Sequence, residues 1–343
     1  MEEFRSDDNL VGKYIHDDGS ETAIKCVSSC DTVRDPATGQ LHRNNVDRRK
    51  YSIFVSSSVG CYMSCNFCYL TLKGSRYGKL AKDRIVANLR EAVTAEFAAN
   101  PDVRDRYVKL NWMGMGEDHL RNPERTAEIT IEMLDWLIGE GYALGLDGVD
   151  VATVLPPKLP ESWISVLQQL AADLSRFPLN PANRQAVHTS NGYVDYRNRS
   201  RLRLFYSLHS ARQATRDVMI PRALPIVDAL DALKAFSDGD RYNLIFHHMF
   251  IDGQNDAAEE IEALLALVLA ADLTPFEFRI LRYNSCSNSP FHETPGFDAI
   301  VERIAAEVPR LKVQISTGTE VKAACGQFIV TRFQPGRALE TAA

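Results

Sequence analysis

Three closely spaced cysteines are the first feature of this 343-residue sequence that could do chemistry. Cys61, Cys65 and Cys68 form a CxxxCxxC motif in the run CYMSCNFC. Three thiolates at this spacing can bind an iron–sulfur cluster, and because a [4Fe–4S] cluster usually takes four cysteines, one iron would be left open to a substrate. Structural zinc is the alternative, with Cys26, Cys30 or a histidine as fourth ligand, but zinc usually binds paired CxxC motifs. The spacing therefore favours an iron–sulfur cluster over zinc.

The composition is that of a globular protein. Hydrophobic residues make up 45% and charged residues 24%, which excludes a disordered or low-complexity chain. With 39 Lys+Arg and 45 Asp+Glu the formal net charge is −6, which argues against a broadly basic surface that coats nucleic acid. No stretch approaches the ~20 apolar residues of a membrane helix, and the N-terminus shows no hydrophobic signal core, so we expect a cytoplasmic protein. In that compartment an odd total of seven cysteines indicates ligands or reactive thiols rather than disulfides.

Alternating strand-like and helix-like segments must position these cysteines. Six β-branched or apolar runs predict strands, at 51–56, 107–113, 148–155, 203–207, 243–251 and 275–281. Amphipathic stretches predict helices near 83–98, 123–139, 160–172, 224–236 and 256–269, and a further strand is predicted at 311–315. This order predicts an α/β fold with a parallel sheet, as an open barrel or a doubly wound sheet, since six strands are too few for an eight-stranded barrel. Catalytic groups then belong on the loops after the carboxyl ends of the strands, where the cysteine motif lies.

Three segments lie outside this alternation. Residues 11–27 resemble a β-hairpin with its turn at 17–20. Residues 31–49 and 174–199 have the composition of long polar loops, the second with four arginines. We therefore expect an N-terminal hairpin and polar loop over 1–50, a core domain over 51–328 with an inserted loop at about 174–199, and a C-terminal tail over 329–343.

The cysteine motif resembles the signature of the radical S-adenosylmethionine (SAM) superfamily, in which the amino and carboxylate groups of SAM chelate the fourth iron. Further motifs occur in order along the chain: SSSVGC at 56–61, MGMGE at 113–117, SLH at 207–209, RDVMIP at 216–221, ND at 255–256 and AACGQ at 323–327. Together they resemble the RlmN/Cfr family of radical SAM adenosine methyltransferases of large-subunit rRNA, from about residue 11 to residue 328. The resemblance implies a partial (β/α)6 radical SAM barrel, a [4Fe–4S] cluster and SAM as cofactors, and a flavodoxin- or ferredoxin-type reductant.

The resemblance also implies a SAM site at the carboxyl ends of the strands. The ring of Phe67 would lie near the adenine, and Glu117, after Gly116, would accept hydrogen bonds from the SAM amino group. Further SAM contacts fall on Thr153, Ser207, His209 and Asn284. At the third strand the family has a Ser-Thr pair where this chain has Ala152-Thr153, so only Thr153 could serve.

The same resemblance implies a catalytic role for Cys325. In the family the matching cysteine takes a methyl group from one SAM, and a radical made from a second SAM abstracts hydrogen from that methyl, which then adds to an adenine carbon. A thiolate suits the first step because it is a strong nucleophile. Glu21 matches a glutamate proposed as proton acceptor in the family.

The chain departs from the family at the cysteine that releases the product through a disulfide. That position, seven residues before the first cluster cysteine, is Phe54 here. Cys26, Cys30 or Cys286 could replace it, and Cys26 is the first candidate because it lies five residues beyond Glu21 on the same hairpin.

Three functions stay open from the sequence. The first is RlmN/Cfr-like methylation of an adenine or related heteroaromatic carbon through Cys325. The second is radical SAM chemistry without methyl transfer, on a nucleoside, peptide or natural-product precursor. The third is a non-catalytic, zinc-stabilised binding protein. The substrate of an enzyme could be RNA or a nucleotide, contacted by the arginines of 174–199, or a small molecule, because only about ten residues precede the hairpin where the family has an RNA-binding extension.

Overall fold

Parallel strands form the centre of the sheet in the computed structural model. Residues 1–26, 31–34, 41–43, 49–181, 186–188, 194–196, 201–237, 244–270, 277–285, 289–308 and 311–314 are described. The parallel strands lie in the order β6 (Lys50–Phe54), β9 (Tyr107–Trp112), β10 (Leu146–Thr153), β13 (Leu202–Ser207), β14 (Leu244–Met249), β15 (Glu277–Leu281) and β16 (Leu311–Gln314). Each of them falls within or next to a predicted strand, so the α/β class and the parallel sheet are confirmed. The curvature of a partial barrel stays a prediction.

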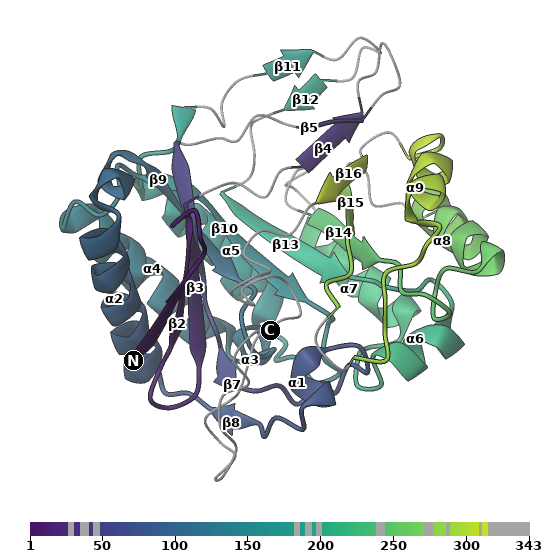
Figure 1. Ribbon diagram of the computed structural model, residues 1–343, viewed down its shortest axis with the longest axis horizontal. Helices are drawn as coiled ribbons and strands as arrows, with labels where there is room; N and C mark the ends of the chain where they lie inside the picture. Colours follow the sequence, from purple (N-terminus) through teal and green to yellow (C-terminus); the bar gives the residue numbers. More distant parts are fainter. Residues whose placement is uncertain are drawn as a thin grey trace.

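Helices cover one face of this sheet (Figure 1). The longer ones are α2 (Lys82–Ala99), α4 (Pro123–Gly139), α5 (Trp163–Asp173), α7 (Ile226–Ser237), α8 (Ala258–Ala270) and α9 (Phe297–Ala305). Single turns occur at α1 (Tyr69–Leu72), α3 (Asp118–Arg121), η1 (Pro101–Asp105) and η2 (Leu174–Arg176), and α6 (Gln213–Met219) is also short. The connections between parallel strands need such crossovers, which explains the alternation seen in the sequence.

Alternate residues of each strand point to opposite faces of the sheet. On β9, Val108, Leu110 and Trp112 are buried in the main hydrophobic core, and the Trp112 indole N–H donates to Thr130 Oγ1 of α4 at 3.0 Å. Lys109 on the same strand points the other way and forms an ion pair with Asp150 of β10. The helix-covered face is therefore apolar, and the opposite face is polar.

An antiparallel meander extends the sheet beyond β6. It consists of β1 (Glu2–Arg5), β2 (Val11–Ile15) and β3 (Glu21–Lys25), and β3 pairs with β6. The predicted hairpin is confirmed as β2 and β3, and its turn includes Gly19 at φ +84°. The strand β1 was not predicted, because its sequence EEFR has no apolar alternation.

Two regions predicted as loops contain paired strands. Within 31–49, β4 (Asp31–Arg34) and β5 (Leu41–Arg43) pair with each other, and β4 also pairs with β16. Within 174–199, β11 (Ala186–His188) and β12 (Val194–Tyr196) form a separate two-stranded sheet. The loop expectation was wrong there because strands this short carry too little alternation to stand out in a polar segment. The boundaries at 50 and 328 stay predictions, although the first segment adds strands to both edges of one sheet.

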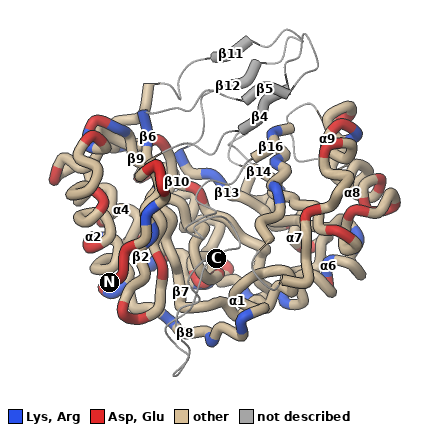
Figure 2. Tube along the Cα trace, in the orientation of Figure 1, with Lys and Arg blue, Asp and Glu red and all other residues tan. Residues whose placement is uncertain are grey.

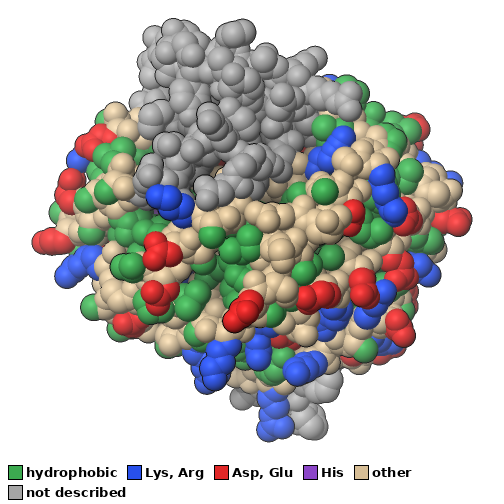
Figure 3. Space-filling model, turned by 180° about the vertical axis from the view of Figure 1, so that it is seen from behind, with side chains coloured by type: hydrophobic (Ala, Val, Ile, Leu, Met, Phe, Trp, Pro, Cys, Tyr) green, Lys and Arg blue, Asp and Glu red, His purple; other side chains and the backbone are tan. Residues whose placement is uncertain are grey.

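Charged side chains of both signs are spread over the described surface. Figure 2 shows acidic and basic residues along the outer helices, and basic residues also on β13 and β16 of the sheet. On the face seen in Figure 3, acidic and basic side chains both occur across the described residues. None of the helices in the described ranges is long and apolar enough to cross a membrane.

Candidate active site

The three cysteines lie in the loop after β6, in the lower part of Figure 1. Before them β7 (Ser58–Val59) pairs with β8 (Gly78–Lys79), and after them α1 begins with Cys68 as its N-cap residue. The Cys68 N–H donates to the Cys65 carbonyl at 3.1 Å, which closes a tight turn between the two. The loop therefore presents its thiols at the carboxyl edge of the sheet, as the sequence predicted.

The three thiols lie close enough to affect one another's ionisation. Burial raises the pKa of Cys65 well above its usual range, and the neighbouring Cys68 and Cys61 raise it further. Burial also raises the pKa of Cys61, and the Glu117 carboxylate adds to this effect. Thiols in these surroundings stay protonated until a metal cation binds them. Binding of iron would convert them to thiolates, which are the form that ligates the metal.

The three thiols are the candidate ligands of a metal group. Within the described ranges, no three His, Cys, Asp or Glu side chains converge on a position that would hold one metal ion. A [4Fe–4S] cluster takes each thiolate on a different iron, so the sulfur atoms must be neighbours without sharing one metal. Cys61 and Cys68 both lie close enough to Cys65 to raise its pKa.

Glu117 lies beside the cysteine loop, after the carboxyl end of β9. Its carboxylate accepts hydrogen bonds from Thr153 Oγ1 (2.8 Å) and from the Val154 N–H (3.2 Å). Burial raises the pKa of Glu117 to about 8. A cationic group next to it would restore the charged form, so the carboxylate suits the ammonium of SAM. Gly116 allows this placement, because its φ is +89° and a Cβ would lie 1.9 Å from Ser58 Oγ.

An aromatic ring and an imidazole meet on the other side of the cysteine loop. The Phe67 and His209 ring centroids are 5.3 Å apart and the planes are nearly perpendicular, at 83°. The Tyr283 hydroxyl donates to the Phe67 carbonyl at 3.0 Å and so ties this loop to the end of β15. Burial lowers the pKa of His209 well below its usual range, and His248 adds to this effect. A neutral imidazole and a phenyl ring form an apolar, π-rich surface that suits a purine.

Ser207 and Asn284 lie at the same edge of the sheet. Ser207 ends β13 and is paired in register with His247 of β14, and Asn284 follows β15 by three residues; both are partly buried. The contacts above bring together Cys61, Cys65, Cys68, Phe67, Glu117, Thr153 and His209, with Gly116 shaping the loop. The roles of all these residues in binding stay predictions.

Sequence reasoning missed His119, which lies behind Glu117. Its Nε2 donates to the Ala152 carbonyl at 2.7 Å, and its Nδ1 lies 3.4 Å from Ser57 Oγ. Because a carbonyl only accepts, Nε2 carries the proton, and burial lowers the pKa of His119 to about 4. The neutral ring thus fastens the loop after β9 to β10. His119 could have been found from the sequence because it lies only two residues after Glu117.

Glu21 and Phe54 share the face of the sheet that points away from the helices. Ala23 pairs in register with Phe54, and Glu21 lies two residues before Ala23, so all three point the same way. Glu21 is fully buried and forms an ion pair with Lys13 at 2.8 Å. The Lys25 ammonium lies 5.0 Å from the centroid of the Phe54 ring. The position of the missing resolving cysteine is therefore filled by a packed aromatic ring.

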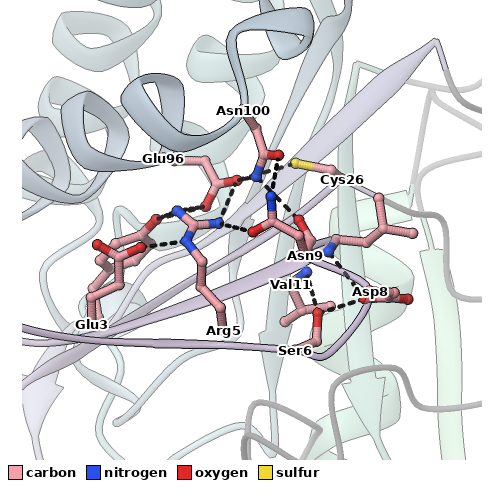
Figure 4. A network of polar contacts seen from close by, with 11 residues as sticks. Glu3, Arg5, Ser6, Asp8, Asn9, Val11, Cys26, Glu96 and Asn100 are labelled. Atoms are coloured by element: carbon pink, nitrogen blue, oxygen red, sulfur yellow. Dashed lines mark hydrogen bonds and ion pairs between the residues drawn. The ribbon is translucent and has the colours of Figure 1, made fainter.

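Cys26 lies on the face of the sheet opposite to Phe54, which argues against it as the replacement for the resolving cysteine; that role stays a hypothesis. It follows Ile24 by two residues and, like Ile24, belongs to the helix-side core. Its thiol donates to Glu96 Oε1 of α2 at 3.5 Å, within a network that also contains Arg5 and Asn100 (Figure 4). Burial raises the pKa of Cys26 to about 12, with Glu96 adding to this effect. The other expected thiols, Cys30, Cys286 and Cys325, lie outside the described residues.

The chain is similar in sequence to curated RNA methyltransferases. No family model matches the chain. It is 28% identical over 294 residues to "Probable dual-specificity RNA methyltransferase RlmN 3" from Opitutus terrae, which covers 82% of this chain and 67% of that protein. It is 24% identical over 289 residues to "Dual-specificity RNA methyltransferase RlmN" from Campylobacter lari, over 82% of this chain and 68% of that protein.

A solved structure supports the fold. The chain superposes on a radical SAM methyltransferase from Sphaerobacter thermophilus with a TM-score of 0.63 and 22% identity. The superposition covers 96% of this chain and 80% of the other. At this level of identity the likeness establishes the fold alone, an α/β architecture with a mostly parallel sheet.

Proposed function

Because this chain is an enzyme related to the radical SAM methyltransferases of the RlmN/Cfr type, we propose that it binds a [4Fe–4S] cluster and SAM at the site described above. Cys61, Cys65 and Cys68 would hold the cluster. One observation carries the proposal: three neighbouring thiols lie beside a largely buried carboxylate, Glu117, which accepts hydrogen bonds from the neutral donors Thr153 Oγ1 and Val154 N–H. The thiols are suited to bind a cluster, and the Glu117 carboxylate beside them is suited to bind a cationic ligand.

When bound, the cluster would supply the electron that cleaves SAM reductively and yields a 5′-deoxyadenosyl radical. Glu117 would accept hydrogen bonds from the ammonium of SAM, and that positive charge would keep the carboxylate ionised. Thr153 orients Glu117 through its hydroxyl. Phe67 and His209 would pack against the adenine, with Ser207 and Asn284 as further contacts. Gly116 lets the loop that carries Glu117 pack closely against Ser58, because a Cβ at this position would lie 1.9 Å from Ser58 Oγ.

For the transfer itself we propose methylation of an adenine or related heteroaromatic carbon through Cys325. A thiolate there would take the methyl group from SAM. Glu21 is the proposed proton acceptor, and its ion pair with Lys13 means that a proton arriving on Glu21 would have to weaken that contact. The relatives are named RNA methyltransferases, which supports RNA as the substrate. A small molecule is the alternative. The reductant would be of the flavodoxin or ferredoxin type.

Phe54 favours a second candidate function. A phenyl ring cannot form the disulfide that releases a methylated product in the RlmN/Cfr chemistry, and it is packed against Val11 and Ala23. The second candidate is radical SAM chemistry without methyl transfer, on a nucleoside, peptide or natural-product precursor. It uses the same cluster and the same SAM site and leaves Cys325 unmodified.

Anaerobic reconstitution tests the common part of both candidates. We expect about four irons per chain and 5′-deoxyadenosine when reductant and SAM are added. Cys65→Ser should abolish iron binding, whereas Cys26→Ser, a buried thiol on the other face of the sheet, should retain it. Stoichiometric zinc without iron would refute both candidates and restore the zinc-binding hypothesis.

Mass spectrometry of the peptide that contains Cys325 separates the two candidates. One added methyl group on Cys325 after expression supports methyl transfer. An unmodified Cys325 in protein that still produces 5′-deoxyadenosine supports the second candidate. Protein with Cys325→Ala gives the blank for the peptide assignment.

A further inference from the structure

A buried arginine joins two strand ends at the candidate site. Arg216 lies on α6 and is 1% exposed. Its Nη1 donates to the Ser207 carbonyl at 3.0 Å and to the Leu208 carbonyl, and its Nη2 donates to the Val154 carbonyl at 3.0 Å. Ser207 ends β13 and Leu208 follows it, and Val154 follows β10. One guanidinium therefore fastens the carboxyl ends of two neighbouring strands to each other.

Each of these strand ends continues into a residue with left-handed backbone. Leu155 has φ +58° and His209 has φ +56°, a conformation that side-chain-bearing residues rarely adopt. In both cases Arg216 binds the carbonyl of the preceding residue, Val154 or Leu208. Residues in such conformations persist where the surroundings hold them, and they cluster at ligand sites. Arg216 is positioned to hold both.

The two strand ends carry the side chains that face the ligand in the proposed function. After β10, Thr153 Oγ1 and the Val154 N–H both donate to Glu117. After β13, His209 packs edge-on against Phe67 of the cysteine loop. A shift between the strand ends would therefore separate the carboxylate that recognises an ammonium from the rings that face a purine.

A second buried side chain holds His209 from the other direction. The Asn255 amide donates to the His209 carbonyl at 2.5 Å and to the Met249 carbonyl at 2.7 Å, and its oxygen accepts from the Ile251 N–H at 2.8 Å. His209 thus lies between an arginine contact on one side and an asparagine contact on the other. The two anchors come from the sequence motifs RDVMIP and ND, neither of which the binding contacts themselves explain.

We propose that Arg216 is a positioning residue for SAM, which sets the distance between Glu117 and His209 by locking the ends of β10 and β13. The inference rests on the proposed function, because it assumes that SAM is the ligand between these two side chains. Arg216 does not touch the ligand in this account. Its guanidinium donates its hydrogen bonds to backbone carbonyls of the two strand ends.

The test compares Arg216→Lys and Arg216→Met with Arg106→Met. Lysine keeps the charge but cannot bridge two strand ends, because it lacks the planar fork of donors. Arg106 is the matched control, since it also donates to a backbone carbonyl, that of Cys26 at 2.6 Å, but lies before the amino end of β9. SAM binding is measured by equilibrium dialysis on reconstituted protein, and hydrogen exchange is measured on the purified protein before reconstitution.

We expect Arg216→Lys to bind iron as the wild type does and to bind SAM about tenfold or more weakly, because at least one charge-assisted hydrogen bond is lost. Exchange should rise at the amides of 153–156 and 207–211 and stay unchanged elsewhere. Arg216→Met should show a larger loss in SAM binding, and Arg106→Met should match the wild type in both measurements.

Wild-type affinity for SAM in Arg216→Lys would overturn the positioning role while leaving the proposed function intact. Equal losses in Arg216→Lys and Arg106→Met would also overturn it, because general destabilisation would then suffice. So would failure of both Arg216 variants to fold. If the wild type itself binds neither iron nor SAM, the proposed function and this inference fall together.

Discussion

Replacement of Glu117 by glutamine should stabilise the ligand-free protein at high pH and weaken SAM binding. The carboxyl is only 12% exposed, and its pKa is raised to about 8 from an ordinary value of 4.5. Below pH 4.5 it is protonated in both the folded and the unfolded chain, so burial has no ionic penalty. Between pH 4.5 and about 8 the unfolded chain releases a proton that the folded chain keeps, and the free energy of unfolding falls.

The size of the effect follows from the same two values. A difference between pKa 4.5 and about 8 corresponds to about 5 kcal/mol above pH 8 as an upper limit, and to about 1 kcal/mol at pH 5.5. Glutamine removes this penalty because it is neutral at every pH and still offers an oxygen to the Val154 N–H. The stability gain of Glu117→Gln over the wild type should therefore be a few kcal/mol larger at pH 8.5 than at pH 5.5.

Urea unfolding of metal-free protein under reducing conditions measures this difference at the two pH values. Titration of other groups cancels when variant and wild type are compared at the same pH. Glu124→Gln, which removes an exposed carboxylate at the start of α4, is the control and should show no such gain. If the stability gain of Glu117→Gln is the same at pH 5.5 and pH 8.5, the pKa of Glu117 is not raised in the ligand-free protein, and the reasoning is refuted. In reconstituted protein the same variant should bind SAM at least about tenfold more weakly.

The remaining predictions concern the glycine loop, the N-terminal meander and the missing thiol. Gly116→Ala should abolish SAM binding, because its Cβ would overlap a serine oxygen at positive φ, whereas Gly74→Ala, also at positive φ but in open space, should bind SAM normally in dialysis. Glu96→Gln should lower the free energy of unfolding by about 2–4 kcal/mol in urea, because it removes the fully buried one of the two anionic partners of Arg5, the other being Glu3; a loss under about 0.5 kcal/mol would contradict this. If Cys325 carries a methyl group, Phe54→Cys should raise the number of product molecules per enzyme in a turnover assay, and an unchanged number would show that resolution is not limiting.

Much of the fold could be predicted because local patterns of apolar and polar residues determine its strands and helices. The parallel strands are apolar runs separated by amphipathic helices, and the cysteine motif follows the first of them. The missed strands β1, β4, β5, β11 and β12 have only three or four residues each, so pairing with a neighbour and not their own pattern makes them strands.

The residues of the candidate site could be predicted from the sequence, but the contacts that hold them in place could not. Motif order placed Glu117, Phe67 and His209 after strand ends at one edge of the sheet; Glu117 contacts Thr153 there, and Phe67 contacts His209. The face on which Cys26 lies could not be predicted from its distance to Glu21, because five residues along a strand say nothing about the face of the sheet until the register is known. The bridging role of Arg216 depends on carbonyls from two different strands, which no local pattern encodes.

The pairing of β4 with β16 has a consequence for how the chain folds. The two strands lie near opposite ends of the sequence, so during synthesis on the ribosome β4 and β5 leave the exit tunnel long before their sheet partner exists. Loop closure over nearly the whole chain is slow, and unpaired strand edges invite association with other chains. The β1–β2–β3 meander, in contrast, can pair with β6 as soon as residue 54 has emerged. Folding should therefore begin at the amino-terminal edge of the sheet and finish with capture of β4, and a chain truncated before β16 should leave that edge exposed to aggregation.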